Sequence, residues 1–261
     1  MTTNFDKVIQ FHTSFGLPYS KTVNQQLLHD FKTVSLRVKL LDEEYGELFN
    51  SKTIVDQLDA IGDLLYVAYG AGICFGFDMN TEYENYCTKL ISQRIIPDTF
   101  HALSNFRKTI FMYDFLKSSI DLDSKNPREI LYAQIIDFQY QIKKFSYALL
   151  MCDTNGVVQS LVKMLFSLYI SGVICHYDLD MLFDIIHQSN MSKLCSSENE
   201  AKKSVEWYVE HEKQRYTQPK YERSPDGKYY VIFDDATGKR LKSINFVVPK
   251  IDVNKIYSPT L

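Results

Sequence analysis

The fold of this chain is decided by Glu43-Glu44-Tyr45-Gly46-Glu47 and, a short way on, Asp59-Ala60-Ile61-Gly62-Asp63. In the first stretch two glutamates stand three residues apart, and in the second two aspartates stand four apart, so each pair lies on one face of a helix. Apolar residues surround both pairs at helical spacing: Leu40, Leu41 and Leu48 around the first, and Leu58, Ile61, Leu64 and Leu65 around the second. The two stretches therefore predict neighbouring helices with buried carboxylates.

Four carboxylates that converge without basic partners repel one another strongly. A divalent cation relieves that repulsion, and a ligand set made only of oxygen atoms suits Mg²⁺ or Mn²⁺. Buried ion pairing is the alternative explanation for the same acids. The pattern predicts a metal site formed by Glu44, Glu47, Asp59 and Asp63.

The composition is that of an ordinary globular protein. Of 261 residues, 45% are hydrophobic and 14% aromatic, enough for one sizeable core or two small domains. A net charge of −3 gives no electrostatic reason to expect a nucleic-acid polymer as a partner, because such binding relies on a clustered basic surface. The five cysteines are odd in number and lack CxxC spacing, which is typical of a reduced, cytoplasmic chain.

No membrane partner or secretory signal is expected. Met1 leads into polar residues rather than an apolar signal region. The longest apolar run, Leu64 to Phe77, lies between Asp63 and Asp78 and is shorter than the roughly 20 residues that span a bilayer. It predicts a buried helix.

The spacing of apolar residues predicts helices almost to position 215. We expect a short helix at 3–13, a long one at 24–50, a third that Ser51 caps and that ends near Gly76, three or four more between 80 and 193, and a charged helix at 198–215. Turns at 124–127 and 153–156 are expected to separate the helices between 80 and 193. Strands at 229–233 and 239–244 are predicted to form a β-hairpin, with an extended tail from 248. Residues 1–195 are expected to form one helical domain, and 196–261 to pack on it.

Several phrases resemble the all-alpha nucleoside triphosphate pyrophosphatases, the superfamily of MazG-like and phosphoribosyl-ATP pyrophosphohydrolase-like proteins. They are Val8-Ile9-Gln10-Phe11-His12, Phe15-Gly16-Leu17-Pro18, the stretch from Asp59 to Val67, His187-Gln188-Ser189-Asn190-Met191-Ser192-Lys193, and a short glycine-lysine turn at Asp226-Gly227-Lys228 or Gly238-Lys239-Arg240-Leu241-Lys242. The similarity covers about residues 5–80 and 178–252, and about a hundred residues intervene where family members have almost none. It implies an all-α helical bundle.

The intervening residues resemble the first part of the chain. A shift of 100 positions superposes Leu65 on Leu165, Tyr69 on Tyr169, Gly72 on Gly172 and Asp78 on Asp178. We interpret this as a tandem duplication that makes a single-chain pseudo-dimer, with a metal-binding half at 1–95 and a degenerate half at 96–195. In the second half Lys143-Lys144 replace Glu43-Glu44, and Gln159 and Lys163 replace the two aspartates. Chance similarity of two apolar helices is the alternative.

The resemblance also implies a set of site residues. In the superfamily, Mg²⁺ held by the acids binds the triphosphate and positions a water for attack. By resemblance Glu44, Glu47, Asp59 and Asp63 are the ligands, Glu43 holds or deprotonates the water, and the phosphates are bound by Arg37, Lys39, Asn190, Lys193 and Lys242. The alternatives are a solvated acid for Glu43 and plain surface lysines for Lys39 and Lys242.

The expected activity is Mg²⁺-dependent hydrolysis of a nucleoside triphosphate to a monophosphate and pyrophosphate. A hydrolase of another diphosphate-linked nucleotide and an inactive nucleotide-sensing or partner-binding protein are the alternatives. The chain has no GxxxxGK[ST], GxGxxG or GxSxG motif that would indicate another chemistry. Further homo-oligomerisation of the pseudo-dimer is compatible with the resemblance.

Overall fold

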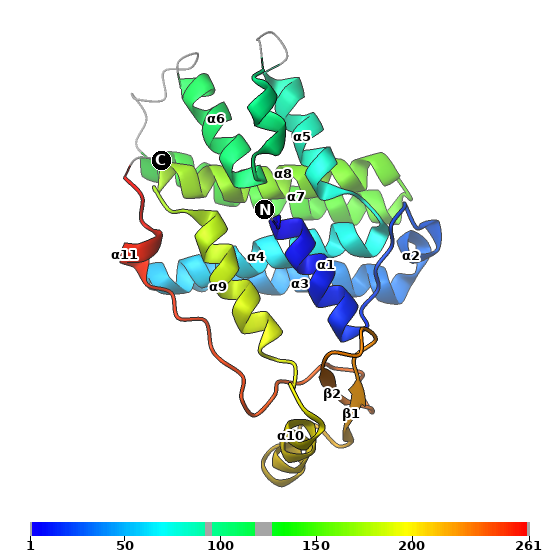
Figure 1. The fold of residues 1–261 in the computed structure, drawn as a ribbon. Helices are drawn as coiled ribbons and strands as arrows, with labels where there is room; N and C mark the ends of the chain where they lie inside the picture. The colour runs from blue at the N-terminus through cyan, green and yellow to red at the C-terminus, as the bar shows by residue number, and fades with distance from the viewer. Residues whose placement is uncertain (1, 92–95, 118–126, 260–261) are drawn as a thin grey trace.

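The computed structural model describes residues 2–91, 96–117 and 127–259 and is mostly helical (Figure 1). The helices are α1 (Asn4–Phe15), α2 (Gln25–His29), α3 (Phe31–Asn50), α4 (Ile54–Phe75), α5 (Met79–Leu90), α6 (Asn105–Lys117), α7 (Pro127–Leu150), α8 (Thr154–Ile174), α9 (Leu179–Met191), α10 (Glu198–His211) and α11 (Val253–Ile256), with a 3₁₀ turn η1 at Asp98–Ala102. The two strands are β1 (Pro219–Arg223) and β2 (Tyr230–Asp234). The predicted all-α class with a small C-terminal hairpin is confirmed.

Two helical hairpins form the centre of the molecule. The α3–α4 hairpin packs on the α7–α8 hairpin, with contacts between α3 and α7 and between α4 and α8 (Figure 1). Within the described residues, α4 and α8 are long and apolar enough to span a membrane, yet 78% and 83% of their apolar windows are buried inside the protein. The core of the bundle accounts for their apolar character, as predicted for the run that begins at Leu64.

Helix boundaries follow local capping rather than periodicity. Thr53, not the predicted Ser51, caps α4: its hydroxyl accepts from the backbone of Asp56, whose carboxylate accepts in return. Ser51 instead ends α3, and its hydroxyl donates to the carbonyl of Leu48. The predicted long helix at 24–50 is divided at Asp30, which adopts an extended backbone and caps α3.

More helices lie between 80 and 193 than predicted. Instead of three or four there are α5, α6, α7, α8 and α9, besides η1. The predicted turn at 124–127 falls mostly on residues outside those described. In the predicted turn at 153–156, Asp153 caps α8 and the residues after it are already helical.

The hairpin has a different pairing from the predicted one. β2 matches the predicted strand at 229–233 within one residue, but its partner is β1, antiparallel, with Tyr221 opposite Ile232. The predicted partner at 239–244 forms only an isolated bridge, between Arg240 and Phe233. β1 was missed because its Pro-Lys-Tyr-Glu-Arg sequence is mostly polar and exposed, so it lacks the apolar alternation by which strands are recognised.

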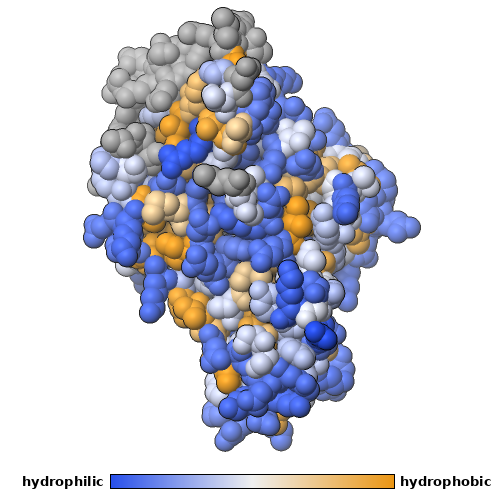
Figure 2. Space-filling model, viewed as in Figure 1, coloured by the Kyte–Doolittle hydropathy of each residue, from blue (hydrophilic) through white to orange (hydrophobic). Residues whose placement is uncertain are grey.

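Residues after the hairpin return to the helical bundle. They run past α9 to α11, where the backbone N–H groups of Asp178 and Ser258 donate to the carbonyls of Ile256 and His176 (Figure 1). The far end of the molecule, around α10 and the strands, presents a largely hydrophilic surface in Figure 2. Its apolar cluster, which includes Cys195 and Ile232, is separate from the main core.

Elements separated by about 100 residues occupy corresponding places. α4 begins at 54 and α8 at 154, and Asp78 and Asp178 cap α5 and α9 through the same backbone contacts. The second helix of each pair packs on the first helix of the other pair: α9, which follows α8, contacts α4, and α5, which follows α4, contacts α8. Between α4 and α8, the buried hydroxyls of Tyr69 and Tyr169 are hydrogen-bonded at 2.8 Å.

Two asparagines extend this pair in matching ways. Asn4 of α1 donates to the hydroxyl of Tyr169 at 3.2 Å, and Asn105 of α6 donates to that of Tyr69 at 2.9 Å. α1 packs on α4 and α9, while α6 packs on α8 and α5. The two sets of helices are therefore arranged alike around the tyrosine pair.

Candidate active site

The acidic side chains of α3 and α4 lie together, less deeply than the sequence predicted. Glu44, Asp59 and Asp63 are half-buried, whereas Glu47 is exposed. The acids repel one another: the charges of Asp63 and Glu47 act on Glu44, and the charge of Glu47 also acts on Asp59 and Asp63. None of the four forms an ion pair with a described cationic side chain.

This crowding changes their protonation. Burial, followed by the charges of Asp63 and Glu47, raises the pKa of Glu44 to about 8. Burial and the neighbouring Asp59 raise the pKa of Asp63 to about 6. Burial also raises the pKa of Asp59. Each ionised form is therefore penalised at neutral pH, and a nearby positive charge would relieve it.

The donor set fits a hard divalent cation. Asp59 Oδ1 is buried and has no hydrogen-bond partner among the described residues, which is costly for a carboxylate oxygen. Oxygen-only ligands match the preference of Mg²⁺ and Mn²⁺. In the described part of the chain, no three carboxylate, histidine or cysteine side chains are close enough to form a ready metal cluster. Binding would thus require these carboxylates to move closer together.

The opposite wall comes from the end of α9 and the segment after β2. Asn190, Lys193 and Lys242 line a cavity of about 200 Å³ together with Asp59 and Asp63. The close approach of α9 to α4 depends on Gly62, because a Cβ there would lie 2.5 Å from Ile186 Cγ1.

The cationic side chains of this wall are held beside the acids. Lys193 Nζ donates to Asn190 Oδ1 at 2.5 Å. Burial lowers the pKa of Lys193, an effect that the negative charge of Asp63 opposes. Lys242 is exposed, with Nζ 4.2 Å from the centre of the Phe246 ring.

Five predicted site residues do not line the cavity. Glu44 and Glu47 still interact electrostatically with Asp63, whereas the other three lie elsewhere. Glu43 and Lys39 are exposed and pair with each other at 3.4 Å, and neither lines the cavity. Arg37 is buried two helical turns from Glu44, against Gly70 and His12, so the structure does not bring it to the acids. Its Nε has no hydrogen-bond partner among the described residues.

The first part of the chain matches a known family. Residues 8–86 match the family model of phosphoribosyl-ATP pyrophosphohydrolase, a member of the all-alpha NTP pyrophosphatase superfamily. The chain is 33% identical to the uncharacterized protein L479 of Acanthamoeba polyphaga mimivirus over an alignment of 256 residues. This alignment covers 95% of this chain and 93% of that protein. Residues 8–86 therefore form a domain similar to those of the all-alpha NTP pyrophosphatase superfamily, and the chain as a whole belongs to the same family as the mimivirus protein. No solved structure matches it.

The family match places the four acids inside a pyrophosphohydrolase domain. Enzymes of this family hydrolyse phosphoanhydride bonds of nucleotides. The matched residues end at 86, whereas Asn190 lies at the end of α9 and Lys193 just after it, more than 100 residues further on. The cavity of this pyrophosphatase-like chain is therefore completed from outside the matched domain.

Sequence reasoning missed several residues of the cavity wall. Ser189, Phe246, Val248 and Pro249 line the cavity, and Ser189 Oγ donates to the carbonyl of Val247 at 2.8 Å. Ser189 lies inside the phrase that also holds Asn190 and Lys193, so the resemblance contained a signal for it. The segment 246–249 has no comparable motif.

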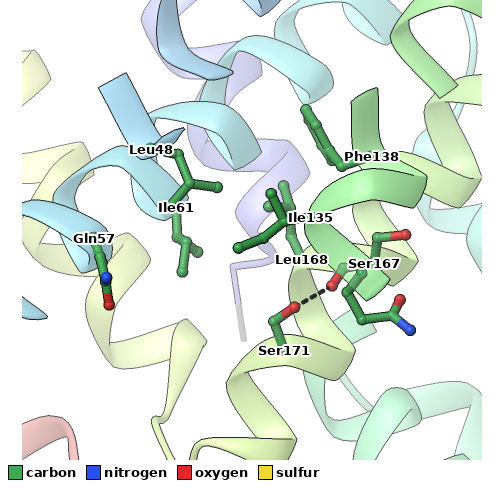
Figure 3. A pocket seen from close by; sticks show the side chains of 9 residues that line it. Leu48, Gln57, Ile61, Ile135, Phe138, Ser167, Leu168 and Ser171 are labelled. Atoms are coloured by element: carbon green, nitrogen blue, oxygen red, sulfur yellow. Dashed lines mark hydrogen bonds between the residues drawn. The ribbon is translucent and has the colours of Figure 1, made fainter. Parts of the chain in front are cut away.

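A second cavity of about 70 Å³ lies between the two helical hairpins (Figure 3). Leu48, Ile61, Phe138 and other largely apolar side chains line it, and none of the four acids does. Its serine hydroxyls already donate within the protein: Ser171 Oγ to the carbonyl of Ser167, as Figure 3 shows, and Ser167 Oγ to a carboxylate of α7. The cavity therefore presents few free polar groups to a ligand.

Proposed function

We propose that this chain is a Mg²⁺-dependent nucleoside triphosphate pyrophosphohydrolase that releases a nucleoside monophosphate and pyrophosphate. The observation that carries the proposal is the cavity in which Asp59 and Asp63 face Asn190, Lys193 and Lys242. Unpaired acids on one wall suit a cation, and amide and ammonium groups on the other suit a phosphate chain.

Each group has a defined role in this proposal. Glu44, Glu47, Asp59 and Asp63 would hold Mg²⁺, or Mn²⁺ in its place. When bound, the ion would supply positive charge that neutralises the phosphates and lowers the pKa of an attacking water. Lys193 and Lys242 neutralise the remaining phosphate charge, and the Asn190 amide, now paired with Lys193, orients a phosphate oxygen.

A panel of nucleoside triphosphates, with Mg²⁺ or with a chelator, tests this proposal. We expect pyrophosphate release that needs Mg²⁺ and falls at least about a hundredfold in Asp63→Asn, since altering even outer-shell groups of metal sites costs 10–100-fold. Asp42→Asn is the matched control, because Asp42 is exposed on α3 and does not line the cavity. Equal turnover by both variants would contradict the assignment.

Glu43 requires a separate test. A general base contributes roughly 10²–10⁴-fold to a rate. The exposed position of Glu43 and its pairing with Lys39 favour a solvated acid outside the reaction. We expect Glu43→Gln to keep most of the turnover, and a loss of that size would restore Glu43 as the base.

Two other functions remain as alternatives. The family whose model matches is named for the hydrolysis of phosphoribosyl-ATP, so that substrate belongs in the panel. A nucleotide-sensing or partner-binding protein would bind nucleotides without releasing pyrophosphate from any of them. Retention of all four acids favours an enzyme.

We also infer that the chain arose by tandem duplication and forms a pseudo-dimer. The helix boundaries repeated at about 100 residues, the exchanged packing of α5 and α9, and the matching contacts of Asn4 and Asn105 support this inference. In this scheme the first half supplies the acids, and the second supplies Asn190 and Lys193.

A further inference from the structure

We propose that the second half contains a separate, metal-independent binding site for the phosphate chain of a nucleotide. The site is a cavity of about 240 Å³ between α7 and α8, where Lys144, Lys163 and Gln159 come together. It is distinct from the acidic cavity, whose lining residues come from α4, α9 and the segment after β2.

Its charge is the reverse of that in the first half. At a shift of 100 positions Lys144 and Lys163 correspond to Glu44 and Asp63, and Gln159 corresponds to Asp59. Ammonium groups at these places attract the phosphate oxygens directly, so no bridging cation is needed. Among the described residues, neither lysine forms an ion pair with a carboxylate.

A buried polar atom gives the second, independent indication of a ligand. Gln141 is only 4% exposed and lines the cavity, and its Oε1 has no hydrogen-bond partner among the described residues. Its Nε2 is already used, because it donates to Asp137 Oδ1 at 3.1 Å. A buried acceptor left unpaired is costly, and a ligand hydroxyl or amino group would satisfy it.

These features favour a nucleotide over pyrophosphate alone. A nucleoside carries hydroxyl and amino groups that can donate a hydrogen bond to Gln141 Oε1, whereas fully ionised pyrophosphate has no donor. Tyr147, 64% exposed, lines the same cavity and offers a ring on which a base can stack. The one acid of the lining, Asp153, is engaged in capping α8 and accepts from the backbone N–H of Gly156 at 3.0 Å.

Calorimetric titration of the full chain with ADP and with pyrophosphate, in chelator, tests the proposal. We expect ADP to bind, with pyrophosphate weaker, and Lys144→Gln/Lys163→Gln to reduce affinity for ADP at least about tenfold, because hydrogen bonds to charged groups are individually strong. Lys143→Gln is the matched control, since Lys143 is exposed on the same helix and does not line the cavity. Circular dichroism confirms that the variants fold.

Lys193→Gln separates this site from the acidic cavity. Metal-free binding should survive in Lys193→Gln and be lost in the double variant, whether or not the chain proves to hydrolyse nucleotides. The reverse result would place the bound anion at the acidic cavity and overturn the proposal. Absence of metal-free binding by the wild-type chain, or equal affinity in the double variant, would overturn it too.

Discussion

Gly62 allows the two walls of the acidic cavity to approach each other. In Gly62→Ala the new Cβ would meet Ile186 Cγ1 at 2.5 Å, close to the root of a stiff β-branched side chain. We expect a loss of about 1–3 kcal/mol in the free energy of unfolding, as for other overpacked cores, measured by urea denaturation. Gly46→Ala is the control: Gly46 has nothing within 4 Å of its added Cβ, so a gain of about 0.5–1 kcal/mol is expected in its helix. Equal effects at both glycines would contradict this interpretation.

The protonation of Glu44 and Asp63 predicts how Mg²⁺ stabilises the fold. Their folded-state pKa values, raised to about 8 and about 6, lie above those of the unfolded chain. The metal-free protein therefore loses stability as pH rises toward 8, while Mg²⁺ competes with fewer protons. We expect the Mg²⁺-induced rise in Tm to be larger at about pH 8.5 than at about pH 6, measured by differential scanning fluorimetry. Asp63→Asn should diminish this rise, and a rise independent of pH would contradict the proposed ligands.

At this scale the sequence predicted the acids better than their cationic partners. Helical spacing alone places Asp59 and Asp63 on one face, and that inference needs no long-range information. Arg37 stands two turns before Glu44 on α3, and only the packing of α1 against α4 shows that it lies away from the cavity. The sequence around a lysine does not show whether it lines a site, because lysines are also common on exposed surfaces.

At the scale of elements, capping decides boundaries that periodicity leaves open. Thr53→Ala removes the capping box of α4 and should cost about 1 kcal/mol, measured by urea denaturation. Ser51→Ala removes only a bond to the carbonyl of Leu48 and should cost less. A larger loss in Ser51→Ala would restore Ser51 as the cap predicted from the sequence. Because Asp59 and Asp63 lie in the first turns of α4, this cap also fixes the start of the helix that carries them.

The hairpin shows where element prediction failed. β2 is a continuous run of apolar and aromatic residues and was found, but its pairing with polar β1 depends on the turn at Asp226-Gly227. Gly227 has φ of 72°, which suits glycine, and Asp226 accepts from the backbone of Lys228. The predicted turn at Gly238 has the same left-handed backbone, so turn residues alone did not distinguish the two.

At the scale of the whole molecule, the two helical hairpins meet through buried tyrosines. The proposed repeat superposes Tyr69 on Tyr169, but only the structure shows that their hydroxyls are in contact, at 2.8 Å. Sequence superposition identifies equivalent positions without indicating which of them lie near an axis between the halves. The exchange of α5 and α9 between them is likewise a long-range feature without a local signal.

That contact predicts energetic coupling between the halves. Tyr69→Phe removes a hydrogen-bond partner from Asn105 and from Tyr169. Tyr169→Phe removes one from Asn4 and from Tyr69. Each variant should lower the free energy of unfolding by about 1–3 kcal/mol, measured by urea denaturation. Both changes remove the same tyrosine–tyrosine bond, and the double variant should therefore lose less than the sum of the two, by roughly 0.5 kcal/mol or more. Tyr113→Phe, on a partly buried ring in α6, controls for loss of a hydroxyl elsewhere. Strict additivity would mean that the tyrosine hydroxyls do not couple the two helical hairpins, which would then be held together by the packing of their helices without this bond.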